Sequence, residues 1–140
     1  MDVFLAGSRP TGRGDSTNFT GTVWRDLIVS APDPCRVRAG FARFEPRART
    51  AWHTHPLGQT LCILFGIGCV QAWGEKGYLV RGGDVVWIPP GEKHWHGAHA
   101  GSTMTYIAIQ QSDDRDIHVD WLEHVTDEQF EAALRTCAPG

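Results

Sequence analysis

The chain has 140 residues, of which 41% are hydrophobic, and its formal net charge is −3 at pH 7. A single domain of this size can bury a stable core, and the weak negative charge excludes bulk attraction to nucleic acid or to an anionic membrane. The start of the chain has only the apolar run Val3–Ala6, and no stretch approaches the roughly 20 apolar residues of a membrane span, so we expect a soluble, cytoplasmic protein.

Residues 1–18 are polar and contain several glycines, which predicts an N-terminal arm before a single domain over residues 19–140. From Phe19 onward, short β-favouring runs alternate with turn residues. The predicted strands are 19–29, 37–44, 50–55, 60–65, 69–73, 77–80, 84–88, 94–97 and 103–111. Strands at this spacing, with no helical pattern between them, indicate a sandwich or barrel. Only the C-terminus predicts a helix, where Thr126 and Gln129 form a capping box.

The four cysteines are Cys35, Cys62, Cys69 and Cys137, and none belongs to a C-x-x-C pair. In a cytoplasmic chain we expect them to be reduced thiols. A bridge between Cys62 and Cys69 is the alternative, because these two residues could lie on neighbouring strands.

Four of the seven histidines form the pairs His53-x-His55 and His94-x-His96. Residues two apart on a strand point to the same face, so each pair directs two imidazoles to one side. Imidazole nitrogens suit Zn, Fe, Mn, Ni and Cu, and the nearby amide oxygen of Gln59 would add a harder ligand. The pattern predicts a metal site; the alternative is a set of ordinary surface or core histidines.

The spacing of these residues resembles two motifs of the cupin family. The first is His53-x-His55-x3-Gln59-x6-Gly66, and the second is Gly83-x5-Pro89-x-Gly91-x2-His94. The resemblance implies an all-β fold, a cupin jelly-roll β-barrel, here with a short C-terminal helix. It also implies one divalent transition metal per chain, bound by His53, His55, Gln59 and His94.

Gln59 departs from the family pattern, which has Glu at this position. A neutral amide leaves the site one negative charge short, so the metal should be a stronger Lewis acid and should bind more weakly. The alternative is that Gln59 lies next to the metal without binding it.

A closer likeness extends over most of residues 19–130. The chain is similar to the small bacterial cupins that include manganese-dependent hydroxynitrile lyases. This resemblance implies a metal-dependent lyase that cleaves and forms cyanohydrins, such as mandelonitrile from benzaldehyde and cyanide, with manganese as the metal and iron, zinc or nickel as alternatives. It further implies a small-molecule substrate and a homo-oligomer, a dimer or tetramer. The segments that carry the likeness are 19–23, 31–34, 49–61, 83–87, 90–98, 121 and 123–129.

Four further residues are candidates for catalysis. His96 shares the face of His94, and its imidazole suits general base work near neutral pH. Tyr106 and Gln110 share one face of the last predicted strand, and the resemblance places both in the pocket, although lyase relatives have histidine where this chain has Tyr106. Thr50 also matches a pocket residue, but strict alternation from His53 would turn it away from the metal.

Two other functions remain open. One is an Fe(II)-dependent cupin dioxygenase, and the other is a cupin that binds or isomerises a small metabolite. An acidic metabolite would require a cationic clamp inside the barrel, for which the nearby candidates are Arg36, Arg38 and Arg43.

Overall fold

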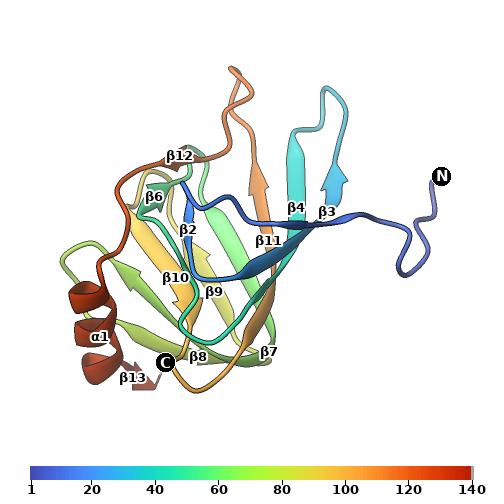
Figure 1. Ribbon diagram of the computed structural model, residues 1–140. Helices are drawn as coiled ribbons and strands as arrows, with labels where there is room; N and C mark the ends of the chain where they lie inside the picture. Colours follow the sequence, from blue (N-terminus) through green and yellow to red (C-terminus); the bar gives the residue numbers. More distant parts are fainter. Residues whose placement is uncertain (140) are drawn as a thin grey trace.

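Two layers of strands make up the body of the computed structural model, which describes residues 1–139 (Figure 1). Every strand pairing is antiparallel except that of β8 with β13. The first layer has the order β1 (Thr11–Arg13), β3 (Val23–Ser30), β4 (Val37–Phe44), β11 (Met104–Gln111), β7 (Gln59–Ala72) and β9 (Val85–Ile88). The second contains β2 (Phe19–Thr20), β5 (Arg49–Thr50), β6 (His53–Thr54), β8 (Tyr78–Arg81), β10 (His94–Ala98), β12 (Asp120–Trp121) and β13 (Ala138–Pro139). The expected all-β barrel with one short C-terminal helix, α1 (Asp127–Thr136), is confirmed.

Strand β7 belongs to both layers and joins them. Its first half pairs with β11 and β9, and its second half pairs with β10 and β8. Gly66 lies between the halves with φ of 81°, and a Cβ there would be 1.9 Å from the carbonyl oxygen of Thr103. Only glycine fits this position. The sequence predicted two separate strands on either side of Gly66, which was wrong: the glycine bends one continuous strand instead of ending it.

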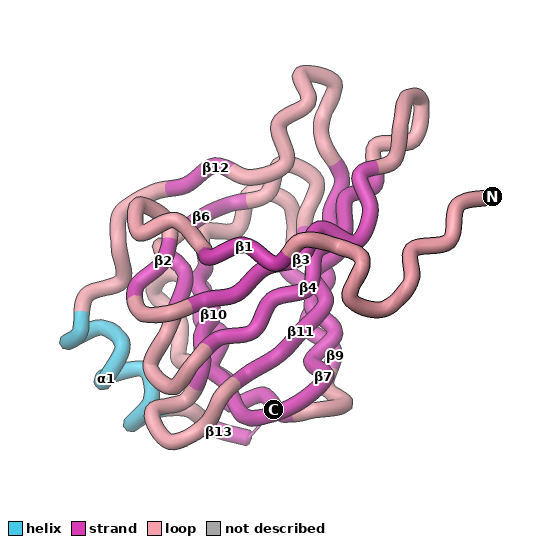
Figure 2. The backbone as a smooth tube through the Cα atoms, turned by 45° about the vertical axis from the view of Figure 1, so that its right-hand side comes forward, coloured by secondary structure: helices cyan, strands magenta, loops and turns pink. Residues whose placement is uncertain are grey.

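The core lies between the two layers, with a second cluster under the helix. Inward-facing residues of both layers, such as Phe44, Leu61 and Met104, fill the barrel. Phe130 of α1 packs on Trp95 of β10, with 5.8 Å between ring centroids. Figure 2 shows α1 on the outside of the strands, while the residues before β1 extend away from them. No helix in the described part of the chain has the length and apolar character needed to cross a membrane.

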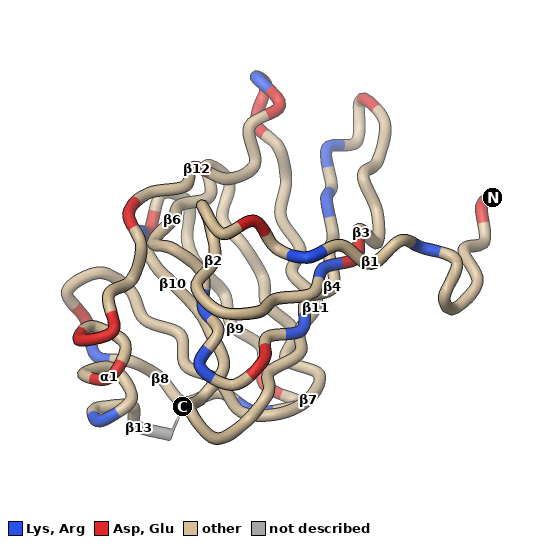
Figure 3. The backbone as a smooth tube through the Cα atoms, viewed as in Figure 1, with Lys and Arg blue, Asp and Glu red and all other residues tan. Residues whose placement is uncertain are grey.

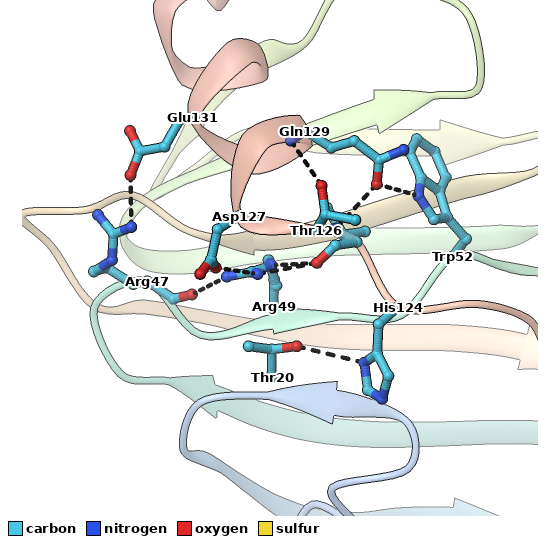
Figure 4. A network of polar contacts seen from close by, with 10 residues as sticks. Thr20, Arg47, Arg49, Trp52, His124, Thr126, Asp127, Gln129 and Glu131 are labelled. Carbon is cyan, nitrogen blue, oxygen red and sulfur yellow. Dashed lines mark hydrogen bonds and ion pairs between the residues drawn. The ribbon is translucent and has the colours of Figure 1, made fainter.

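The start of α1 is attached to the barrel by a buried arginine (Figure 4). The predicted capping box is confirmed, since Thr126 and Gln129 each accept a backbone N–H of the other. Arg49 of β5 is only 3% exposed. Its guanidinium donates to the carbonyl of Val125 over 2.9 Å and to the carboxylate of Asp127 over 2.7 Å. The helix is therefore held at its N-terminal end by charge-assisted hydrogen bonds from the barrel.

The structure does not support the disulfide bridge between Cys62 and Cys69 that the sequence left open. Cys62 and Cys69 lie on the same strand, β7, so they do not face each other across a strand pair. Cys69 instead has its sulfur 2.6 Å from that of Cys137 at the end of α1, and all four thiols are free.

The outer face of the first layer carries several exposed apolar side chains. Phe65, Val85, Trp87 and Ile109 are all exposed on it. Large exposed apolar patches are typical of interaction surfaces. The homo-oligomer expected from the sequence stays a prediction.

We expect Arg49→Met to lower the free energy of unfolding by about 3 kcal/mol, because it leaves a buried carbonyl without its donor. Arg47→Met is the matched control, since Arg47 is half exposed and pairs with Glu131 at the surface. That change should cost no more than about 0.5 kcal/mol. Guanidinium unfolding of both variants measures the difference, and equal losses would contradict the anchoring role of Arg49.

Candidate metal centre

Four buried imidazoles meet where β6 and β10 pair. His53 and His94 are direct cross-strand partners, and their ring centroids are 4.1 Å apart. His96 lies two residues further along β10, on the same face. One ring nitrogen from each of His53, His94 and His96 lies within 4.8 Å of the other two, so this cluster could hold a metal ion. His55 follows β6, with its ring centroid 5.1 Å from that of His53.

Three of these rings are held by backbone carbonyl groups. Nδ1 of His53 is 3.0 Å from the carbonyl oxygen of Ala51, and Nδ1 of His94 is 2.8 Å from that of Glu92. Nδ1 of His55 is 2.5 Å from the carbonyl oxygen of His118. A carbonyl oxygen can only accept, so each Nδ1 carries the proton and each Nε2 keeps its lone pair. Such bonds orient metal-binding histidines in proteins.

Several buried acceptors of the cluster have no partner among the described residues. They are Nε2 of His55, Nε2 of His94, Nε2 of His96 and Oε1 of Gln59. The amide nitrogen of Gln59 donates to Oε1 of Gln110 over 3.1 Å, which leaves the Gln59 oxygen free. Unpaired buried acceptors are costly, and a cation would satisfy all of them at once. The donor set therefore fits a divalent transition metal.

Burial keeps these imidazoles neutral. Loss of solvation is the main cause that lowers the pKa of His53 and His96, and the neighbouring imidazoles lower both further. Burial likewise lowers the pKa of His94 to about 4. At pH 7 the rings are therefore uncharged, and their lone pairs are available to a cation.

His96 differs from the other three histidines in its partners. Its Nδ1 is 3.3 Å from the phenol oxygen of Tyr106, and its backbone N–H donates to Oγ1 of Thr50 over 3.2 Å. Burial raises the pKa of the Tyr106 phenol, which stays protonated. A phenol can donate or accept, so this contact permits either tautomer of His96.

The structure turns Thr50 inward, which strict alternation from His53 did not predict. Residues 51 and 52 interrupt the strand, since Ala51 and Trp52 donate their backbone N–H groups to Asn18 and Glu123. The two short strands on either side, β5 and β6, therefore have independent side-chain parity. Thr50 is 1% exposed and lines the pocket.

A cavity of about 260 Å³ lies beside the imidazoles. This is slightly below the roughly 300–1,000 Å³ of pockets for drug-sized ligands. Of the eight predicted site residues, only His94 is not part of its wall. The predicted residues that line it are Thr50, His53, His55, Gln59, His96, Tyr106 and Gln110.

The cavity wall also contains residues that the sequence interpretation missed: Phe19, Arg25, His118 and Trp121. The ring centroid of Trp121 lies 4.8 Å from that of His53. Alternation from the apolar Val23 was a signal that could have placed Arg25 on the inner face of β3.

Comparisons with known proteins give matches in both sequence and structure. Residues 40–110 match the cupin domain model. The chain is 52% identical to an (R)-mandelonitrile lyase of Granulicella tundricola, over 93% of this chain and 98% of that protein. A cupin-like protein of Thermotoga maritima is 35% identical in sequence, and its crystal structure superposes with a TM-score of 0.80 over 98% of both chains. A polyketide cyclase of Streptomyces resistomycificus is 16% identical and shares the fold, with a TM-score of 0.73 over 94% of this chain and 91% of that one.

Either His53→Ala or His94→Ala should weaken Mn²⁺ binding by more than about 100-fold. Losing a residue that only hydrogen-bonds to a metal ligand typically costs about 10–100-fold, and these two histidines are expected to be ligands themselves. Equilibrium dialysis followed by elemental analysis measures the metal bound per chain. His124→Ala is the control, because this exposed histidine lies outside the cluster. Unchanged Mn²⁺ affinity in both variants would rule out a metal centre here.

Proposed function

The chain belongs to the cupin family, and we propose that it is a metal-dependent lyase that cleaves cyanohydrins into a carbonyl compound and cyanide. The reverse addition would use the same site. The observation that carries the proposal is a neutral, unpaired His96 Nε2 beside a set of free metal-binding acceptors, in a pocket sized for a small molecule. The 52% identity to a protein named (R)-mandelonitrile lyase supports the same reaction.

In this proposal His53, His55, Gln59 and His94 hold one manganese ion, and His96 is left to act as the base. The hydrogen-bond partner of Nδ1 in each ring supports this division into three ligands and one base. Carbonyl groups lock the three proposed histidine ligands with the proton on Nδ1. Tyr106 leaves His96 free to gain and lose a proton, as a base must.

The bound metal would act as a Lewis acid that lowers the pKa of the cyanohydrin hydroxyl. Nε2 of His96 takes the hydroxyl proton, while its Nδ1–H donates to the phenol oxygen of Tyr106 and so stabilises the imidazolium. The electron pair of the O–H bond forms the new C=O bond, and the pair of the C–C bond leaves with cyanide. His96 then returns the proton to cyanide, which leaves as hydrogen cyanide, and His96 is neutral again.

Thr50 and Gln110 act as positioning residues. The hydroxyl of Thr50 accepts the backbone N–H of His96 and fixes the strand at that residue. Gln110 accepts the amide of Gln59 and keeps the Gln59 oxygen directed to the centre. Both contacts support the preorganisation that a catalytic site requires.

His96→Ala should lower kcat for benzaldehyde release from racemic mandelonitrile by about 10²–10⁴-fold, as expected for loss of a general base. The variant should keep its manganese, whereas His55→Ala should lose manganese and activity together. Absorbance of the released benzaldehyde and elemental analysis of the same samples separate the two effects. Retained metal in His55→Ala with lost metal in His96→Ala would instead assign His96 as the ligand.

Tyr106→Phe should lower kcat by about tenfold, the equivalent of one hydrogen bond to the imidazolium. The manganese content should not change, because Tyr106 touches only His96 among the histidines of the cluster. Benzaldehyde release equal to that of the unaltered protein would exclude a role for the phenol.

Manganese-loaded protein that releases no more benzaldehyde than a metal-stripped sample would refute the lyase proposal. Family membership would stand in that case. Oxygen consumption by the iron-loaded protein would then favour an Fe(II)-dependent dioxygenase.

A further inference from the structure

One arginine faces the inside of the pocket at its outer end. Arg25 follows Val23 by two residues on β3 and shares its face of the strand, but Arg25 is exposed to solvent at the mouth of the cavity whereas Val23 is fully buried. Its guanidinium lies over the Phe19 ring, 5.4 Å from the centroid. Tyr106 and His118 are two other residues of the cavity wall. In Figure 3 charged residues gather on β1, β3 and β4 and on the loops.

Within the described residues Arg25 pairs with no carboxylate, although the neighbouring Asp26 also lines the cavity. Across residues 1–139, its guanidinium forms no hydrogen bond or ion pair. Arg38, which also lines the cavity, is fully engaged: it donates to Ser112 and Asp116 over 2.7 Å and to Ser30 over 3.0 Å. Arg43 faces outward and pairs with Glu45. Arg25 is therefore the cation of the cavity that is free to bind a ligand.

The strand register places small residues between Arg25 and the imidazole cluster. Arg25, Ala42 and Tyr106 form one row across β3, β4 and β11. Neighbouring strands are about 4.8 Å apart, so Arg25 and Tyr106 are separated by roughly two strand spacings. Ala42, together with Gly40 on the same strand, leaves this part of the wall open. A planar substituent can lie over Ala42, with one end at the imidazoles and the other at Arg25.

We propose that Arg25 forms an anion subsite that selects substrates with a carboxylate at the end remote from the reacting carbon. The identity of the reacting carbon rests on the proposed function, whereas the subsite depends only on Arg25. A guanidinium pairs with a carboxylate through two parallel hydrogen bonds. A single free cation neutralises a carboxylate, whereas a phosphate dianion would remain half compensated. The preferred substrate is then the cyanohydrin of an aromatic aldehyde acid, such as 4-formylbenzoate.

The test compares two cyanohydrins with manganese-loaded protein: mandelonitrile and its 4-carboxy analogue. The measured quantity is the ratio of their kcat/KM values, carboxylated over neutral. Arg25→Met should lower this ratio by about tenfold or more, equivalent to 1.4 kcal/mol. Arg25→Lys should lower it less, because it keeps the charge but loses the planar fork. Arg43→Met is the matched control, with the same loss of charge on the outer face, and should leave the ratio unchanged.

Binding separates this proposal from the lyase proposal. Isothermal titration calorimetry of manganese-loaded protein with 4-formylbenzoate, benzaldehyde and phenyl phosphate needs no turnover. Tighter binding of 4-formylbenzoate that Arg25→Met removes would support the subsite even if neither cyanohydrin were cleaved. Cleavage of both cyanohydrins with a ratio that Arg25→Met does not alter would overturn the subsite and leave the lyase proposal intact. Tighter binding of phenyl phosphate than of 4-formylbenzoate would also overturn the choice of a carboxylate.

Discussion

A single kind of hydrogen bond, from an imidazole Nδ1–H to a backbone carbonyl, governs the centre of this protein. It occurs at His53, His55 and His94, and in each case it fixes both the orientation of the ring and the position of its proton. Burial lowers the pKa of each of these rings, and Nε2 of His55, Nε2 of His94 and Oε1 of Gln59 are buried acceptors without a donor. Buried acceptors without a hydrogen-bond donor lower the stability of the fold, and a bound cation would remove that cost.

The two layers of the barrel contribute different chemistry to this centre. Strands β6 and β10 supply three of the four imidazoles, and His55 directly follows β6. The direct pairing of His53 with His94 sets the separation of those two rings. Strands β7 and β11 supply amide and phenol groups, which reach the same point from the other layer. Because β7 runs through both layers, the bend at Gly66 determines how the two sets of groups meet. The geometry of the site is thus a consequence of the path of one strand.

The cavity has two chemically distinct ends. At the inner end lie the imidazoles and Tyr106, where neutral groups can exchange a proton. Toward the outer end lies Arg25, a cation that pairs with no carboxylate of the described residues, and the wall between them has little side-chain volume. Such an arrangement allows one end of a small molecule to react while the other end determines which molecule binds. Reaction and selectivity can then be altered separately, because they depend on different strands.

The sequence by itself determined the fold class, the capping box of α1 and the histidines that could hold a metal. These features follow from local patterns: histidine pairs separated by one residue, the turn residues between strands, and the spacing of Thr126 and Gln129. Only the tertiary structure decided the continuity of β7, the inward position of Thr50, the partner of Cys69 and the place of Arg25 in the cavity. Each of these depends on a contact between segments distant in the chain. Thr50 illustrates the reason: backbone groups of Asn18 and Glu123 interrupt its strand, and side-chain alternation, which is a local rule, cannot register an interruption imposed from elsewhere.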